Sequence, residues 1–129
     1  MSKTINYSPE VRAIFTEQEN DGFKIELLNT AREIQYLGLL MENALSLPGF
    51  YDQKALDGKL ILATISKQNR PIVCLEFEEF NGTLAIIQAK TKQNKLLYKD
   101  NEHEDALNFL TRFLLLNNIK IGTGDIGIV

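Results

Sequence analysis

The sequence contains few of the residues from which many enzyme and metal sites are built. It has one cysteine, Cys74, and one histidine, His103, among 129 residues. A single cysteine excludes a disulfide within the chain, which is typical of proteins kept in a reducing compartment. One histidine without a cysteine cluster excludes the usual closed zinc site. We therefore expect a cytoplasmic protein without a metal ion.

Glycine-rich signatures and long apolar runs are also missing. The sequence has no Walker loop, no dinucleotide-binding fingerprint and no Gly-x-Ser-x-Gly elbow. No apolar run approaches the roughly 20 residues that a helix needs to span a bilayer. The first residues lack the apolar segment of a secretory signal. We expect no cofactor and no association with a membrane.

Neither sign of charge is in large excess. The sequence has 14 lysines and arginines against 17 acidic residues, a net charge of −3. General phosphate binders usually have a basic balance, and a mimic of nucleic acid would be far more acidic.

The length and the apolar fraction of 44% fit one domain over residues 1–129. We place its core at about 23–117 and expect a flexible tail over 122–129.

Three helices are predicted from their starting residues. Ser8 before a proline is a good cap for a short N-terminal helix. Thr30 and Glu33 have the spacing of a capping box, which predicts a helix over Thr30–Ser46. An acidic first turn suits the positive end of a helix dipole and predicts a last helix over Glu102–Leu116.

Alternating apolar and polar residues predict the strands of a sheet. The strands are expected at residues 23–27, 59–66, 72–79 and 84–91. Asn81-Gly82 is a strong signal for a tight hairpin between the last two of them. A short edge strand over 119–121 is possible, and the segment 51–58 is expected to be a link.

These elements predict an α+β fold. We expect an antiparallel sheet of three or four strands with the Thr30–Ser46 and Glu102–Leu116 helices packed over one face and the short N-terminal helix beside them. Leu39 and Leu40 widen the apolar stripe of the first long helix, which predicts that this helix is covered on more than one side.

Five ordered pieces between Phe23 and Phe113 resemble a known family. They are the helix start Asn29–Glu33, its continuation Leu37–Leu45, the pair Tyr51 and Gly58, the turn Asn69–Pro71 before Leu75–Phe77, and the run Gln88–Asn94. In this order they resemble the PcfJ-like family, whose members are associated with conjugative plasmids and other mobile elements. The resemblance implies the family's fold and a mobile-element setting.

The chain departs from this family where the family has histidine and cysteine. Glu42, Asn43 and Ala44 stand at these positions. The resemblance therefore implies no thiol or imidazole chemistry for this chain. A small domain that keeps the scaffold without these residues fits an adaptor or an inhibitor, for example of a bacterial defence enzyme.

The remaining candidates for chemistry have simpler explanations. His103 lies among acidic residues, as a metal ligand or general base would, but this pattern is typical of a solvated first helical turn. Cys74 has apolar and acidic neighbours that disfavour a thiolate, so we predict a buried thiol that packs as a small apolar group. We therefore assign no catalytic and no metal-binding residue.

Two carboxylates keep a further possibility open. Alternation places Glu76 and Glu78 on one strand face, which is usually solvated. If a helix covered that face, these acids would need partners. The least favoured function is a degenerate hydrolase-like activity that uses Glu42 or Glu76, and it would require a cleft holding a carboxylate of raised pKa.

The most basic stretch, Lys90–Lys99, is the first choice for a binding surface. The candidate residues are Gln88, Lys90, Lys92, Asn94, Lys95 and Tyr98. The first three would share a strand face and offer donors to an acidic protein surface or to phosphates. The alternative, which we favour for the stretch as a whole, is that its lysines only protect a sheet edge from aggregation.

These observations together predict a binding protein and not an enzyme. We expect a protein partner, with nucleic acid bound through the Lys90–Lys99 stretch as the alternative. The chain is expected to be a monomer or a homodimer.

Overall fold

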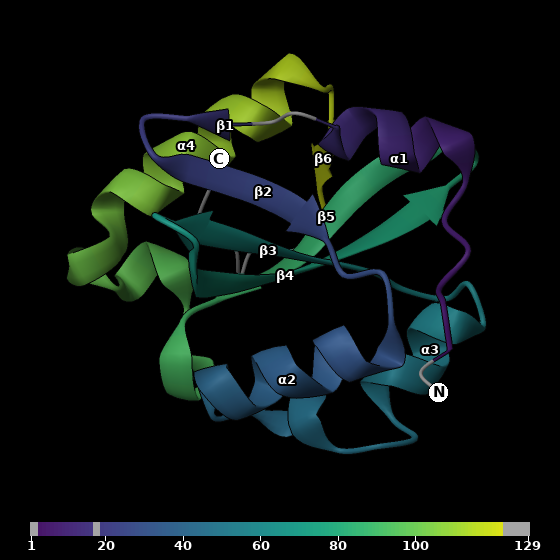
Figure 1. Ribbon diagram of the computed structural model, residues 1–129. Coiled ribbons are helices and arrows are strands. Elements are labelled where there is room, and N and C mark those ends of the chain that lie inside the picture. Colours follow the sequence, from purple (N-terminus) through teal and green to yellow (C-terminus); the bar gives the residue numbers. More distant parts are fainter. Residues whose placement is uncertain (1–2, 17–18, 123–129) are drawn as a thin grey trace.

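A six-stranded sheet lies between two layers of helices in the computed structural model, which describes residues 3–16 and 19–122 (Figure 1). The strands follow one another across the sheet in sequence order: β1 Glu19–Asn20, β2 Phe23–Leu27, β3 Ile61–Lys67, β4 Arg70–Phe80, β5 Thr83–Lys90 and β6 Lys120–Ile121. Strands β1 to β5 pair with one another in antiparallel fashion, and β6 pairs with β5 in parallel fashion. The α+β class is confirmed, but the sheet is wider than predicted and is mixed, because the two-residue strands β1 and β6 extend its edges.

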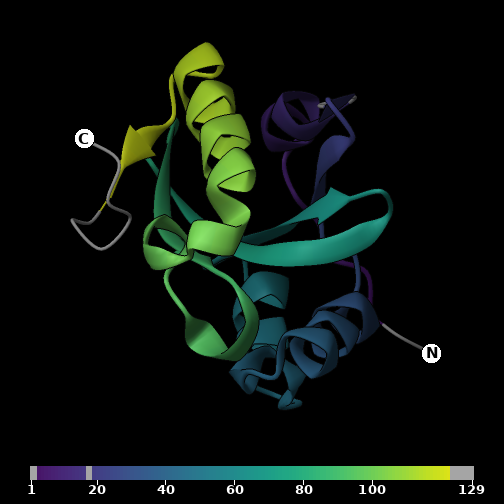
Figure 2. The ribbon, with the colours of Figure 1, turned by 90° about the vertical axis from the view of Figure 1, so that its left-hand side faces the viewer.

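Helices and short turns occupy both sides of this sheet. The α-helices of the described ranges are α1 Pro9–Phe15, α2 Ala31–Met41, α3 Tyr51–Leu56 and α4 Glu104–Leu116. The 3₁₀ turns are η1 Ala44–Ser46, η2 Lys92–Asn94, η3 Leu97–Lys99 and η4 Asn101–His103. The segment that carries η2 to η4, green in Figure 2, reaches from the sheet to the α2 layer. None of the described helices has the length and apolar character needed to cross a membrane.

Two of the three predicted helix starts are confirmed, and both long helices are shorter than expected. Helix α4 begins at Glu104 and not at Glu102, because residues 101–103 form the turn η4. Ser8 caps α1, and the Thr30 hydroxyl accepts a hydrogen bond from the Glu33 amide at 3.1 Å. The Glu33 carboxylate accepts one from the Thr30 hydroxyl at 3.0 Å. Helix α2 then ends at Met41, because Glu42 takes a left-handed conformation with φ of 55°. The predicted end at Ser46 is wrong, because the last three residues of the predicted helix form a separate 3₁₀ turn, η1.

The two long helices lie on opposite faces of the sheet, so the prediction of one shared face is wrong. The α4 face buries Ile61, Ala63 and Ile65 of β3, together with apolar residues of α1 and α4. The α2 face buries Leu60 and Leu62 with apolar residues of α2, η1 and α3. Because both sides of β3 are apolar, each needs its own cover. Figure 1 shows α4 and α1 on one side of the sheet and α2 and α3 on the other.

Two predictions about the α2 layer are also wrong. Residues 51–58 were expected to form a link, but most of them form helix α3. Leu39 and Leu40 were expected to be covered, but they are 69% and 40% exposed. Helix α2 therefore packs on the sheet with one side only and leaves part of its apolar surface uncovered.

Both ends of the described chain contact the sheet or its core. Ile5 and Phe15 are buried, so the core includes residues that precede position 23. Near the other end, the Gly122 amide donates a hydrogen bond to the Ile86 carbonyl at 2.8 Å. The rest of the tail predicted to be flexible, residues 123–129, lies outside the described residues.

Candidate functional site

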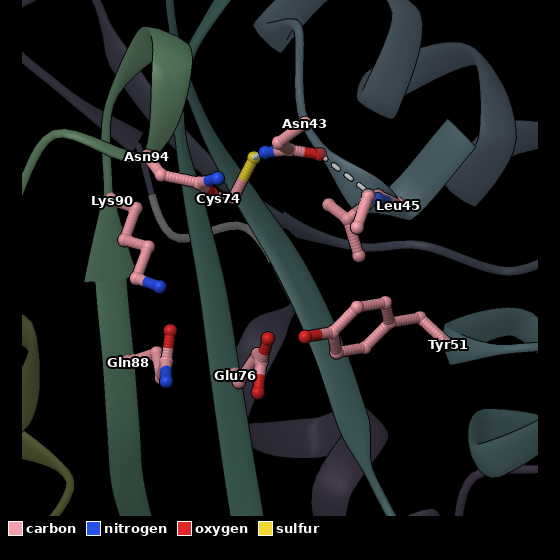
Figure 3. Close-up of a pocket in the computed structure, with 9 residues that line it drawn as sticks. Asn43, Leu45, Tyr51, Cys74, Glu76, Gln88, Lys90 and Asn94 are labelled. Atoms are coloured by element: carbon pink, nitrogen blue, oxygen red, sulfur yellow. Dashed lines mark hydrogen bonds between the residues drawn. The ribbon is translucent and has the colours of Figure 1, made fainter. Parts of the chain in front are cut away.

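A small cavity lies on the α2 face, where η1 and the start of α3 meet β4, β5 and η2 (Figure 3). Its volume is about 110 Å³. The lining residues are Asn43, Ala44, Leu45, Tyr51, Cys74, Glu76, Gln88, Lys90 and Asn94. Most of these side chains carry polar or charged groups, which distinguishes the cavity from the apolar cores on the two sides of the sheet.

Two neighbouring strands build the floor of the cavity. In the register of β4 and β5, Cys74 lies opposite Lys90, and Glu76 lies opposite Gln88. Side chains two residues apart on a strand point to the same face of a sheet. These four side chains therefore form a compact square that faces the α2 layer, with one acid and one base at diagonal corners.

The end of helix α2 builds one wall. The backbone N–H of Asn43 donates to the Gly38 carbonyl at 3.0 Å, and this bond ends the helix. A Cβ atom at position 38 would collide with the backbone nitrogen of Ser46, so only glycine allows η1 to fold back this closely. This close approach holds Asn43 and Leu45 at the cavity.

The side chain of Asn43 is fully engaged in holding this wall. Its Oδ1 accepts a hydrogen bond from the Leu45 amide at 3.0 Å, and its Nδ2 donates to Cys74 Sγ at 3.6 Å. Burial raises the pKa of the Cys74 thiol to about 12, although the contact with Asn43 opposes the shift. The thiol is buried, as predicted, and stays protonated near neutral pH, so it is no nucleophile.

Glu76 is the half-buried acid of the cavity. Burial raises the pKa of its carboxyl, Lys90 and Lys54 oppose this shift, and Glu78 adds to it. The Tyr51 hydroxyl points toward Glu76 (Figure 3), and burial together with the charge of Glu76 raises the pKa of Tyr51. Glu76 is thus covered from the α2 side by Tyr51. This is the condition under which we expected the acid to need a partner.

Across the described ranges, the side chains of Glu76, Gln88 and Lys90 form no hydrogen bond and no ion pair. Their polar atoms are not sealed from water. The cavity thus holds an acid, a base and an amide that remain available to a ligand.

The six residues of the predicted binding surface separate into two groups. Gln88, Lys90 and Asn94 line the cavity, whereas Lys92, Lys95 and Tyr98 do not. Strand β5 ends at Lys90, so Lys92 does not share its strand face as expected.

Two of these lysines are already paired with acids. Lys92 Nζ lies 3.3 Å from a carboxylate oxygen of Glu42, and Lys95 Nζ lies 3.8 Å from one of Asp100. The stretch therefore offers less free positive charge than its sequence indicates.

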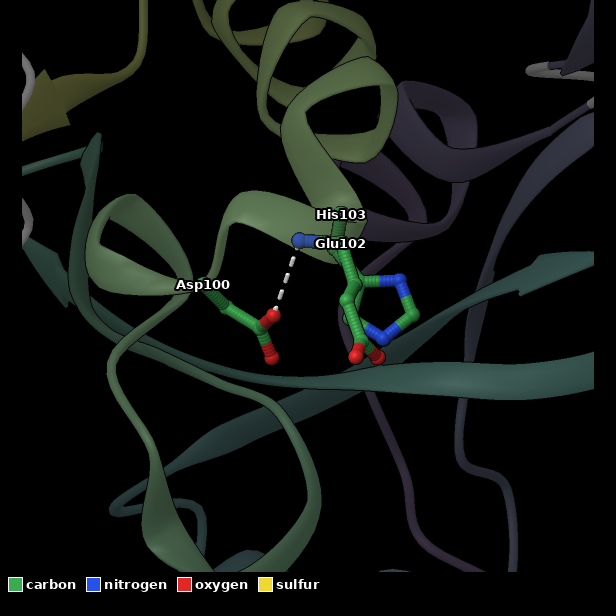
Figure 4. A group of neighbouring side chains, drawn as sticks. All are labelled: Asp100, Glu102 and His103. Atoms are coloured by element: carbon green, nitrogen blue, oxygen red, sulfur yellow. Dashed lines mark hydrogen bonds between the residues drawn. The ribbon is translucent and has the colours of Figure 1, made fainter.

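The acidic surroundings of His103 serve to order a turn. Atoms of Asp100, Glu102 and His103 that could bind a metal lie within 4.8 Å of one another (Figure 4). However, Asp100 already accepts hydrogen bonds from the Thr91 hydroxyl at 2.6 Å and the Glu102 amide at 3.2 Å. Burial alone would raise the pKa of Asp100, but these bonds, with His103 and Lys95, lower it. The group belongs to η4 and its cap, just before helix α4, and Asp100 is buried, so it is not the solvated first turn of α4 that was predicted.

Sequence reasoning did not bring Asn43, Tyr51 and Glu76 together with Gln88 and Asn94. A signal was nevertheless present, because every lining residue except Cys74 belongs to one of the ordered pieces on which the family resemblance rests. Four of the five pieces supply lining residues, whereas Asn29–Glu33 supplies none.

No protein-family model, no curated protein and no solved structure matches this chain. The resemblance to the PcfJ-like family therefore stays a prediction.

Proposed function

We propose that this protein is a non-enzymatic binding module that holds another protein by accepting one of its side chains in the cavity. The observation that carries the proposal is the set of unpaired groups on the cavity floor, Glu76, Gln88 and Lys90. These groups are half-buried and reach water, so they are free to bind a ligand in its place. A concave site that keeps such groups unpaired offers them to a ligand.

The size of the cavity favours a side chain over a metabolite. Sites for small molecules usually measure about 300–1,000 Å³. The cavity of about 110 Å³ is much smaller. It matches the end of one side chain, anchored by contacts that continue outside the cavity.

The surface on the same elements favours a protein over a nucleic acid. Leu39, Leu40, Leu47 and Phe50 are exposed on the end of α2 and in its connection to α3. These elements also supply the cavity wall. Exposed apolar side chains beside a pocket are typical of protein interfaces, whose binding energy is concentrated in a few anchoring residues.

The resemblance to the PcfJ-like family supports a setting for this activity. A plasmid, phage or integrated element that encodes a small binding domain could use it as an adaptor or as an inhibitor of a bacterial defence enzyme. An inhibitor of this kind predicts a stoichiometric complex with its target.

A second candidate function rests on Glu76. A covered carboxylate of raised pKa in a cleft is the feature that a degenerate hydrolase-like activity requires. Glu42 lacks this feature, because it is exposed and paired with Lys92. We rank catalysis below binding because the cavity provides no reactive nucleophile beside Glu76.

The experiment is an affinity capture of the tagged protein from bacterial lysate, with and without nuclease, read by intact-mass spectrometry. Binding predicts one protein in stoichiometric amount, of unaltered mass, that survives nuclease. Recovery of nucleic acid, or loss of all partners after nuclease, would contradict the proposal and favour the Lys90–Lys99 stretch. A partner whose mass changes only when Glu76 is present would favour catalysis.

A further inference from the structure

We propose that the group selected by the cavity is an uncharged carboxamide, the side chain of an asparagine or glutamine of the protein partner. This inference rests on the proposed function and names the chemistry of the anchor. It follows from the arrangement of acceptor and donor groups on the cavity floor, from the balance of charge around them, and from the size of the cavity.

The floor has an acceptor end and a donor end. Glu76 and Lys90 are diagonal neighbours on the antiparallel strands β4 and β5, and such side chains have Cα atoms about 7–8 Å apart. Figure 3 shows Lys90 on the side of Asn94, and Glu76 on the side of Tyr51. A ligand between the ends meets an acceptor at Glu76 and donors at Lys90 and Asn94.

A carboxamide matches both ends at once. Its NH₂ group donates, and its carbonyl oxygen accepts. With the NH₂ group directed at Glu76 and the oxygen at Lys90, it would satisfy the two charged groups that lack partners in the described structure. Gln88, which lies opposite Glu76 on the neighbouring strand, can serve either end because its own side chain is an amide.

The balance of charge disfavours both an anionic carboxylate and a cationic ammonium or guanidinium group as the ligand. Glu76 and Glu78 are offset by Lys90 and Lys54, which all act on the site electrostatically. A carboxylate attracted to Lys90 would lie close to Glu76, and an ammonium or guanidinium group attracted to Glu76 would lie close to Lys90, so each attraction is offset by a repulsion. Like charges in a half-buried site repel strongly because the surroundings screen them poorly.

The apolar part of the lining suits the stem of such a side chain. Leu45, Cys74 and the ring of Tyr51 complete the cavity. The volume of about 110 Å³ accommodates a carboxamide with a short aliphatic stem, and it leaves no room for a second large group.

The test is an NMR titration of the ¹⁵N-labelled protein with three small probes that share a three-carbon stem: butyramide, butyrate and propylammonium. We expect saturable shifts of the backbone amides of Gln88, Lys90 and Asn94 with butyramide. Binding of the other two probes at equal ionic strength should be at least about tenfold weaker, equivalent to about 1.4 kcal/mol. A wild-type preference for butyrate or propylammonium, or no saturable shift with any probe, would overturn the inference.

Two substitutions should redirect the preference. With Glu76→Gln, the repulsion of anions is removed, and butyrate should become the tightest probe. With Lys90→Gln, the repulsion of cations is removed, and propylammonium should become the tightest. A purely structural role of these residues predicts weaker binding of all probes without any inversion, which would contradict the assignment. If one variant does not fold, the other variant and the wild-type preference decide.

Failure of this inference differs from failure of the proposed function. If wild type prefers a charged probe while Glu76→Gln abolishes capture of the protein partner, only the carboxamide is wrong. If no protein partner is captured, the proposed function fails, whatever the probes show.

Discussion

The two faces of the sheet differ in the size and make-up of their cores. On the α1 and α4 face, the core is apolar and includes a cluster of aromatic rings, in which Phe15 contacts Phe77 and Phe113 with centroids 5.3 Å apart. On the α2 face, the core is smaller and gives way to a cavity that exposes Glu76, Gln88 and Lys90. The same strands thus carry a larger apolar core on one face and a smaller core with a polar cavity on the other.

The largest effect is expected from the α1 and α4 face. Phe77 is fully buried and packs edge-on against Phe15. Phe77→Ala should lower the free energy of unfolding by about 3–5 kcal/mol, because it leaves a cavity among large side chains. Urea denaturation measures this loss. The exposed neighbour change Glu79→Ala is the control, and a similar cost for both would contradict the assignment of the main core to this face.

The next effect is expected where α2 joins the cavity. Gly38→Ala should cost about 1–3 kcal/mol, because the added methyl group forces η1 away from the helix. It should also weaken capture of the partner, because Asn43 and Leu45 move with η1. Leu39→Ala on the same helix is the control for stability. Unchanged stability and unchanged capture for Gly38→Ala would show that the close approach is not required.

A smaller effect is expected in the loop beside the cavity. Asp100→Ala should cost about 1 kcal/mol at pH 7, a typical value for a lost cap. Because the pKa of Asp100 is lowered in the folded protein, its stabilisation is present above the unfolded value of about 3.9 and is lost as the pH falls through the folded value. The difference from wild type should therefore shrink below about pH 4. A constant difference from pH 7 to pH 2 would contradict this account.

The smallest effect on stability is expected for Glu76→Gln. The folded-state pKa of Glu76 is raised, so its charge disfavours the folded state above the unfolded pKa, and this cost is relieved as the pH falls through the folded pKa. The variant should be as stable as wild type at pH 7 or slightly more stable, with a change within about 0.5 kcal/mol. Thermal denaturation at pH 7 and pH 5 tests this. A loss above about 1 kcal/mol would give Glu76 a structural role.

The features predicted from sequence are those that nearby residues determine. The Ser8 cap, the pairing of Thr30 with Glu33, and the Asn81-Gly82 turn, with φ of 50° and 80°, each depend on a few residues in a row. Helix α3 was missed because its first turn has no side-chain cap, so it lacks a local signal.

The layers and the cavity depend on packing between distant segments. The apolar pattern of Ile61, Ala63 and Ile65 identified one face of β3, but Leu60 and Leu62 form the core of the other face. The cavity was only partly predicted, through Gln88, Lys90 and Asn94. Its remaining residues come from the turn after α2, from the first residue of helix α3 and from strand β4, and no local sequence pattern shows that these segments meet.

The most direct test of recognition at the α2 face is capture of the protein partner by Glu76→Gln, compared with wild type and with Glu79→Gln on the same strand. We predict that Glu76→Gln keeps its thermal midpoint but loses most of the captured partner, whereas Glu79→Gln retains both. Equal capture by all three proteins would contradict the proposal that the cavity is the recognition site.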